Sequence, residues 1–216
     1  MNHEPAAAKF FDKFAEAFDT IYDGRRNFLM RSLDRHFRSD MFLRFALTFE
    51  GRNLKEKTVL DIGCGSGPYV VEALSRGASW VTAVDPSPKM LALVRERLKR
   101  ANLAERCSLV ESFFPGVDVE AHDYVIVMGV MDYVADAGVF LAALKPLVKL
   151  SAAVSFPSKH WFRTPFRRFR YRLRRCPVYF YDETNIKQLC SAAGFGTMEI
   201  RKIPGAGMDY HVCLKP

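Results

Sequence analysis

Two kinds of apolar pattern alternate along most of this chain. Continuous runs of β-branched and aliphatic residues predict strands that are buried on both faces. Such a run lies at residues 57–63, and further strands are predicted at 80–85, 107–112, 123–130, 151–156, 197–203 and 208–215. Apolar residues at three- and four-residue spacing predict helices at 86–101, 137–149 and 183–195. One more helix is expected to begin at Pro68, because the missing N–H of proline costs nothing at the first helical position.

The order of these segments predicts the fold class. Strands that alternate with helices imply right-handed βαβ crossovers, so we expect a doubly wound α/β fold with a mostly parallel, seven-stranded sheet. The last two strands are joined by a short glycine turn, and we expect the last strand to be antiparallel. Apolar residues at helical spacing between residues 5 and 50 predict two or three helices before the first strand.

The chain is expected to form a single domain over 1–216, because no linker or internal repeat divides it. Within it we distinguish an N-terminal helical segment at 1–50 and a core at 51–158. An insertion follows at 159–181, and a C-terminal helix with a strand pair occupies 182–216.

Composition narrows the class of protein. A length of 216 residues with 49% hydrophobic and 26% charged residues is ordinary for a globular domain. The five cysteines are scattered and never in CxxC spacing, which argues against a disulfide framework and a zinc site, so no metal is expected. The N-terminus lacks a signal-peptide pattern, and the longest apolar run, at 124–131, is too short to span a membrane. The sequence therefore predicts a cytoplasmic protein.

The positive charge is concentrated in one stretch. Residues 159–175 contain Lys159 and seven arginines without an acid, which equals the formal net charge of +8. As a helix, this stretch would place its aromatic residues on one face and its arginines on another. Three interpretations stay open: a cap with solvated arginines, a clamp for an anionic or lipid-carried substrate, and a contact with nucleic acid or a membrane surface.

The sequence VLDIGCGSGPY at 59–69 indicates a ligand-binding turn between a strand and a helix. Its glycines follow a GxGxG spacing, whereas a dinucleotide site has GxGxxG and Pro68 stands where the third glycine would be. Asp61 precedes the first glycine by two residues and would repel a pyrophosphate by several kcal/mol. The turn therefore favours a cationic ligand without phosphate, and S-adenosylmethionine has this chemistry.

A second acid supports the same ligand. Asp85 ends the next predicted strand, 22 residues after Gly63, where a carboxylate can accept hydrogen bonds from both ribose hydroxyls. It would also reject a 2′-phosphate. The alternative is that Asp85 caps the helix that follows.

These segments resemble a known family. VLDIGCGSG, AVDPSPKML, the turn at 111–114 and DYVIVMGVMDYV are similar, in order and spacing, to the motifs of class I S-adenosylmethionine-dependent methyltransferases. The resemblance covers residues 50–160 and implies a Rossmann-like fold, S-adenosyl-L-methionine as cofactor and methyltransferase activity. The chain is also loosely similar to magnesium-protoporphyrin and ubiquinone-pathway O-methyltransferases.

The resemblance also implies a set of cofactor-binding residues. Those around the methionine part are Asp61, Gly63, Cys64, Gly65 and Gly67; those around the ribose and adenine are Asp85, Pro86, Met90, Ser112 and Phe113; those along the methyl-transfer channel are Met128 and Gly129. The N-terminal segment is similar to a helical lid and would bring Tyr22 over the cofactor. For Met90 and Tyr22, core packing is the alternative.

The acceptor is expected outside the carboxyl ends of the strands. The polar residues there are Asp132, Tyr133 and His160, and His160 is the best candidate base because its ordinary pKa lies near neutral pH. Alternatively, His160 is a surface residue and Asp132 caps the following helix. Arg163 and Arg170, with Tyr133 and His160, are candidate substrate-binding residues.

The turn after the fourth strand, MGVMDYV, lacks the Asn/Asp-Pro-Pro-Tyr and Pro-Cys motifs of nucleic-acid methyltransferases. A small-molecule or lipid-like acceptor, methylated at oxygen, is therefore expected, with peripheral membrane contact through 159–175 as an option and nucleic acid disfavoured. Two other functions stay open. One is a non-catalytic S-adenosylmethionine-binding partner protein with a basic surface, and the other is an NAD-dependent oxidoreductase.

Overall fold

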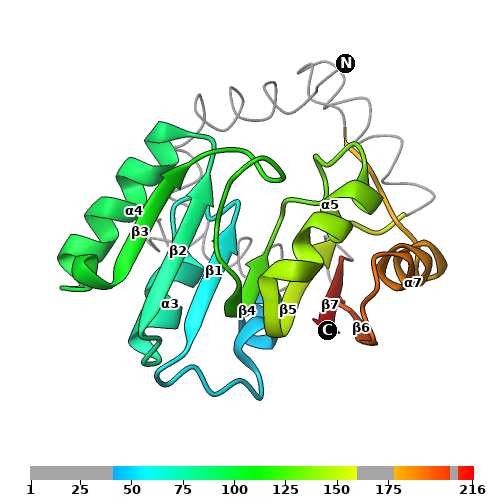
Figure 1. The fold of residues 1–216 in the computed structure, drawn as a ribbon, viewed down its shortest axis with the longest axis horizontal. Helices are drawn as coiled ribbons and strands as arrows, with labels where there is room; N and C mark the ends of the chain where they lie inside the picture. The colour runs from blue at the N-terminus through cyan, green and yellow to red at the C-terminus, as the bar shows by residue number, and fades with distance from the viewer. Residues whose placement is uncertain (1–40, 160–177, 205–208) are drawn as a thin grey trace, which may run out of the picture.

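A seven-stranded sheet forms the centre of the computed structural model, which describes residues 41–159, 178–204 and 209–216 (Figure 1). The strands are β1 (Thr58–Ile62), β2 (Trp80–Asp85), β3 (Cys107–Glu111), β4 (His122–Val127), β5 (Val148–Phe156), β6 (Thr197–Lys202) and β7 (Tyr210–Lys215). Their order in the sheet is β3-β2-β1-β4-β5-β7-β6. The first five strands are parallel, and β7 runs antiparallel to both of its neighbours. The predicted fold class is confirmed.

Helices cover both faces of the sheet. On one face, α5 (Ala137–Leu144) and α7 (Glu183–Ala192) pack over a core that includes Leu60 of β1. On the other, α3 (Pro68–Ser75) and α4 (Pro88–Arg100) pack over a core that includes Val59 of the same strand. Neighbouring residues of β1 thus enter opposite cores, because successive side chains of a strand alternate between its faces. This explains why the strand sequences are apolar without alternation.

The helices begin at residues that satisfy their free N–H groups. Pro68 is the first residue of α3, as predicted. Ser87, Asp136 and Asp182 are the N-caps of α4, α5 and α7, and the side chain of each accepts a hydrogen bond from the N–H three residues later.

The boundary between α5 and β5 differs from the prediction of a helix at 137–149 and a strand from residue 151. The helix ends at Leu144, a 3-10 turn spans Lys145–Leu147, and β5 already begins at Val148. Pro146 explains the early end, because it lacks the N–H that the next α-helical hydrogen bond needs.

Two ends of the described chain meet between β5 and α7. Ser158 and Tyr181 form a parallel bridge, and the Lys159 N–H donates to the Tyr181 carbonyl oxygen at 2.9 Å. The Lys159 ammonium also donates to Asp182 at 2.7 Å and to Asn185 at 2.8 Å. Residues 159 and 178–181 therefore lie side by side, at the two ends of the predicted basic insertion.

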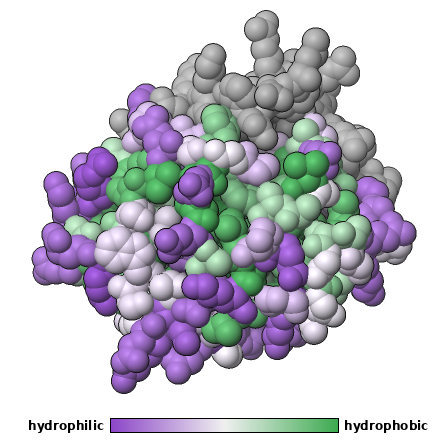
Figure 2. All heavy atoms as spheres, viewed as in Figure 1, coloured by the Kyte–Doolittle hydropathy of each residue, from purple (hydrophilic) through white to green (hydrophobic). Residues whose placement is uncertain are grey.

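The surface shows no single apolar region on the face drawn in Figure 2. Hydrophobic residues there are interspersed with hydrophilic ones, outside the part that grey atoms cover. No helix within the described ranges combines the length and the apolar character that crossing a bilayer requires.

Candidate functional site

The glycine turn between β1 and α3 lies at the carboxyl edge of the sheet, against the end of β2. Gly63 and Gly67 have φ angles of 69° and 81°, a region that residues with a Cβ rarely adopt. The N–H groups of Gly63 and Cys64 both donate to the Val84 carbonyl oxygen, at 2.7 and 3.1 Å. The strand β2 thus fixes the backbone of the turn. The side chains of Val130 and Val94 pack where a Cβ of Gly63 and Gly67 would lie, whereas the space beside Gly65 is open and lets a ligand approach the backbone closely.

Asp85 ends β2 and holds the turn in place. Its Oδ2 accepts a hydrogen bond from the Gly65 N–H, and its Oδ1 accepts one from the Ser87 N–H, both at 2.9 Å. Because Ser87 is the N-cap of α4, the alternative that Asp85 caps this helix is wrong. Each carboxylate oxygen has a second lone pair and can accept a further hydrogen bond from a ligand hydroxyl.

Asp61 is a buried acid without a partner for one of its oxygens. It lies beside Ala83 of β2, is only 1% exposed, and its Oδ2 has no hydrogen-bond partner among the described residues. Burial, and then the charge of Asp85, raises the pKa of Asp61 to about 8. Burial also raises the pKa of Asp85, although the N–H groups of Ser87 and Gly65 oppose this change.

The two acids decide which ligand charge the turn can accept. Both resist ionisation, so a cation beside them stabilises their carboxylates, whereas a phosphate adds further repulsion. The unpartnered Oδ2 of Asp61 is in addition a free acceptor for an N–H donor. The residues present therefore fit a positively charged ligand with hydroxyl groups.

The turn after β4 packs on the glycine turn. A Cβ at Gly63 would collide with the side chain of Val130, so these two turns are in direct contact. Met128 is buried, and the Gly129 N–H donates to Ser155 Oγ of β5 at 2.8 Å. The structure therefore brings Met128 and Gly129 to the same edge as the glycine turn.

Asp132 and Tyr133 follow in the same turn. Asp132 is buried, and its carbonyl oxygen accepts a hydrogen bond from the Tyr179 N–H at 2.9 Å. Tyr133 is half-buried, and its N–H donates to the Val130 carbonyl oxygen at 2.9 Å. The N-cap of α5 is Asp136, so the alternative that Asp132 caps this helix is wrong.

The residues predicted for the adenine side come from the ends of β2 and β3. Glu111 pairs with Asp85, so Ser112 and Phe113 continue the chain next to Asp85 and Pro86. Ser112, Phe113 and Pro86 are half-buried, and Ser112 Oγ donates to the Phe113 carbonyl oxygen at 3.3 Å. Met90 is 3% exposed but belongs to neither core cluster of described residues.

Four predicted residues, Tyr22, His160, Arg163 and Arg170, lie outside the described residues. Conversely, sequence reasoning missed Val130 and Ser155. Ser155 carried a signal, since it is a polar residue near the end of a buried strand. Val130 carried none, because its contact with Gly63 arises only from the packing of two distant segments.

Metal binding finds no support in residues 41–159, 178–204 and 209–216. Their His, Cys, Asp and Glu side chains form no group of three or more that could hold a metal ion.

Comparison with known proteins finds similarity to methyltransferases. Residues 59–150 match the model described as a methyltransferase domain. The chain is 37% identical over 107 residues to the ubiquinone biosynthesis O-methyltransferase of Bradyrhizobium diazoefficiens, which covers 48% of this chain and 41% of the relative. It is 26% identical over 175 residues to the protein of the same name from Neisseria meningitidis serogroup C, covering 74% of this chain and 70% of the relative. The chain thus spans less than half the length of the Bradyrhizobium protein.

A solved structure has the same fold. The magnesium protoporphyrin IX methyltransferase of Synechocystis, crystallised with S-adenosylhomocysteine, superposes with a TM-score of 0.76 over 100% of both chains at 19% identity.

Proposed function

Because this chain belongs to the class I S-adenosylmethionine-dependent methyltransferases, we propose that it transfers the methyl group of S-adenosylmethionine to a small-molecule acceptor. The observation that carries the proposal is the buried pair of Asp61 and Asp85 beside the glycine turn. S-Adenosylmethionine supplies a methyl carbon activated by its sulfonium. The protein then has to bind and orient two molecules, and positioning alone accounts for much of the rate.

In this proposal each group of residues has one task. Asp61 and the turn formed by Gly63, Cys64, Gly65 and Gly67 hold the methionine part of the donor. Asp85 accepts hydrogen bonds from the ribose hydroxyls through the lone pairs that Gly65 and Ser87 leave free.

The adenine lies among the side chains beyond Asp85. Pro86, Met90 and Phe113 provide apolar contacts, and Ser112 provides a hydroxyl. Met128 and Gly129 border the path of the methyl group toward the acceptor, which is supported by their contact with the glycine turn through Val130.

The acceptor is a small or lipid-like molecule that is methylated at oxygen. The names of the Bradyrhizobium and Neisseria relatives support this choice. Asp132 and Tyr133 border the acceptor, and the hydrogen bond from the Tyr179 N–H to the Asp132 carbonyl oxygen ties the last part of the insertion to this turn. The roles of His160 as a base, of Arg163 and Arg170 as acceptor contacts, and of Tyr22 as a cofactor contact stay predictions.

Binding and turnover test the proposal separately. Calorimetric titration should show binding of S-adenosylhomocysteine and no binding of NAD, and Asp85→Ala should weaken the former at least tenfold by removing the ribose contact. Turnover is then sought with a methyl-labelled donor and a panel of phenolic and lipid acceptors. Binding of NAD without S-adenosylhomocysteine would identify an oxidoreductase, and binding without any turnover would favour the non-catalytic partner protein.

The arginines of the basic stretch give a second test. Exchange of Arg163 and Arg170 for methionine should lower kcat/KM for the acceptor and leave the affinity for S-adenosylhomocysteine unchanged. Arg95→Met, on the exposed side of α4, is the control variant. A large loss of S-adenosylhomocysteine affinity in the double variant would contradict the assignment of these arginines to the acceptor.

A further inference from the structure

A cavity of about 420 Å³ lies at the other end of the sheet from the glycine turn. Its walls come from residues 47–52, at the end of the helix at residues 41–49, and from β4, β5, β6 and β7. Tyr124 and Ser151 line it from the first halves of β4 and β5, whereas the candidate cofactor site lies beyond the last residues of the parallel strands. A volume of this size is typical of a small-molecule site.

The lining combines apolar and charged walls. Leu47, Tyr124 and Leu150 supply apolar surface. The charged residues are the cations Arg52, Arg201 and Lys215 and the acids Glu50 and Glu199, which leaves one uncompensated positive charge. The cavity therefore fits a ligand with an apolar part and a single negative charge.

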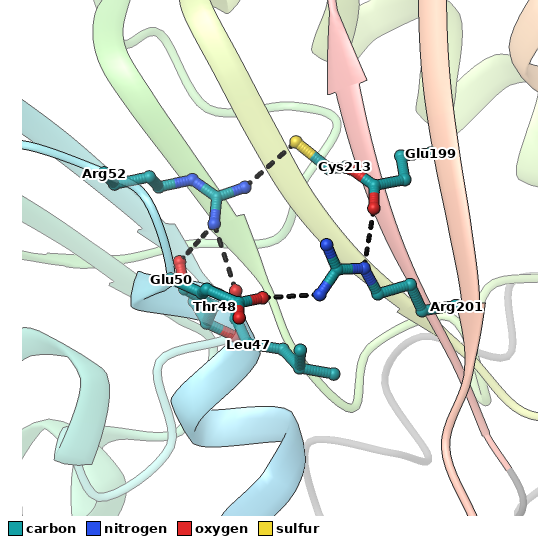
Figure 3. Close-up of polar contacts among 7 residues, drawn as sticks. All are labelled: Leu47, Thr48, Glu50, Arg52, Glu199, Arg201 and Cys213. Atoms are coloured by element: carbon teal, nitrogen blue, oxygen red, sulfur yellow. Dashed lines mark hydrogen bonds and ion pairs between the residues drawn. The ribbon is translucent and has the colours of Figure 1, made fainter.

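The two arginines are held in place by their own hydrogen bonds (Figure 3). Arg52 donates to the carbonyl oxygens of Leu47 and Thr48 at the helix end and, through Nη2, to Cys213 Sγ of β7 at 3.1 Å. Arg201 lies between Glu199 and Glu50 and pairs with both. The positive charges are thus fixed before any ligand arrives, which lowers the entropic cost of binding.

His211 provides an unused hydrogen-bonding group in the same cavity. It lies on β7 two residues before Cys213, is 3% exposed, and its Nε2 has no hydrogen-bond partner among the described residues. A buried polar atom without a partner is rare and indicates a missing ligand or water.

The charges that act on His211 come from the helix end at 44–52 and from β6, and β4 and β7 add further titratable side chains to the cavity wall. Burial, and then the charges of Arg52, Arg201 and Arg44, lower the pKa of His211 to about 4 against the opposing effect of Glu199. Of the other lining residues, Tyr124, Cys213 and Lys215 are titratable and Glu50 is paired with Arg201. The potential at His211 is therefore positive, which favours an anion beside it.

We propose that this cavity binds a small organic monocarboxylate, whose carboxylate accepts a hydrogen bond from His211 Nε2 and whose apolar part packs against Tyr124, Leu47 and Leu150. The site is separate from the candidate cofactor site and does not depend on the proposed methyl transfer.

Benzoate and benzamide are a matched pair of probes, because they share size and ring and differ in charge. In NMR titrations of the histidine rings, benzoate should shift the His211 signals saturably and raise the pKa of His211 by at least about one unit, since the carboxylate stabilises the imidazolium. Benzamide should produce neither change. His211→Phe assigns the signal and should abolish benzoate binding.

Lys215→Met tests the charge without disturbing the buried histidine. It should weaken benzoate binding about two- to fivefold, as expected for a partly solvated charge, whereas Lys99→Met on α4 should change nothing. Saturating S-adenosylhomocysteine should not displace benzoate. Equal binding of benzamide, no binding of benzoate at millimolar concentration, or binding of inorganic phosphate in place of benzoate would each overturn the proposal.

Discussion

At the scale of single residues, the placement of Asp61 costs the protein stability. Its carboxyl is buried beside a second acid and lacks a partner for Oδ2 among the described residues. A residue of this kind is retained at a binding site because a ligand supplies the missing interaction.

The pH dependence of stability should reveal this cost. The pKa of Asp61 is about 8 in the folded protein, against an ordinary value of 3.8 for an aspartate. Between these pH values the folded state keeps a proton that the unfolded state has lost. The contribution of Asp61 to stability is therefore greatest below pH 4 and falls as pH rises toward 8. The slope is about 1.4 kcal/mol per pH unit for one proton.

Urea unfolding of Asp61→Asn between pH 5 and 8 measures this effect, because the amide has no proton to lose. The variant should be more stable than the parent at pH 7. Its free energy of unfolding should not show the decrease with rising pH that Asp61 causes in the parent. Asp118→Asn, at an exposed site, is the control. Parallel pH profiles for the parent and Asp61→Asn would contradict the burial of an acid at this position.

The same residue should couple ligand binding to pH. A cationic ligand needs the carboxylate, so its binding must release the proton of Asp61. Between pH 5.5 and 7.0 the affinity for S-adenosylmethionine should therefore rise by up to tenfold per pH unit in the parent. Calorimetry should find weaker binding with a flatter pH dependence in Asp61→Asn. If the substitution leaves the pH dependence of the affinity unchanged, Asp61 does not interact with the ligand.

At the scale of elements, the contact between the glycine turn and the turn after β4 positions the candidate site. Gly63 has both a left-handed φ of 69° and the Val130 side chain where a Cβ would lie. Gly51 has nearly the same φ, 66°, with nothing within 4 Å of a built Cβ. A substitution at Gly51 therefore measures backbone strain alone, whereas one at Gly63 measures backbone strain together with the steric clash with Val130.

Thermal or urea unfolding of the alanine variants tests this distinction. Gly51→Ala should cost about 1–2 kcal/mol from the left-handed backbone alone. Gly63→Ala should cost clearly more, and adding Val130→Ala should recover part of the difference. Equal losses at the two glycines, or no recovery with Val130→Ala, would show that the turns are not in contact.

The local sequence was sufficient to predict the strands and to place the residues at their carboxyl ends. Continuous apolar runs predicted β1 and β2 because both faces of the sheet are covered, and chain order then placed Asp85 beside the glycine turn. The start of β5 was predicted three residues too late, since Leu147 and Val148 continue the apolar spacing of the preceding helix and Lys149 interrupts the apolar run.

Contacts between distant segments could not be predicted from a single sequence. Ser155 accepts from Gly129 and Arg52 reaches Cys213 only after β5 and β7 are placed in the sheet. The sequence also could not show that Asp61 Oδ2 lacks a hydrogen-bond partner, because this depends on the positions of all the residues that surround it. Sequence patterns therefore identified the candidate residues, and packing determined their environment.

At the scale of the whole molecule, one sheet carries both cores. Residues from β1 and β4 enter the cluster beneath α5 and α7 and also the cluster beneath α3 and α4. Because neither core can form without these strands, we expect the residues that the structure describes to unfold as one cooperative unit.

Two optical probes test this cooperativity. The chain has two tryptophans, and Trp161→Phe leaves Trp80 at the start of β2 as the single fluorescent reporter. Its fluorescence and the circular dichroism of the helices should follow the same urea transition, and S-adenosylhomocysteine at 100 times its Kd should stabilise both by about 2.7 kcal/mol. Separate midpoints for the two signals would indicate independent units.

The bridge between Ser158 and Tyr181 has a consequence for how such proteins diversify. It joins the chain on either side of 160–177, with Lys159 tied to Asp182 and Asn185. A segment grafted between such fixed stems adds only about 0.6 kcal/mol of closure entropy for each doubling of its length. Chimaeras that exchange this stretch with a relative's should therefore keep the sheet intact and, under the proposed function, change the acceptor.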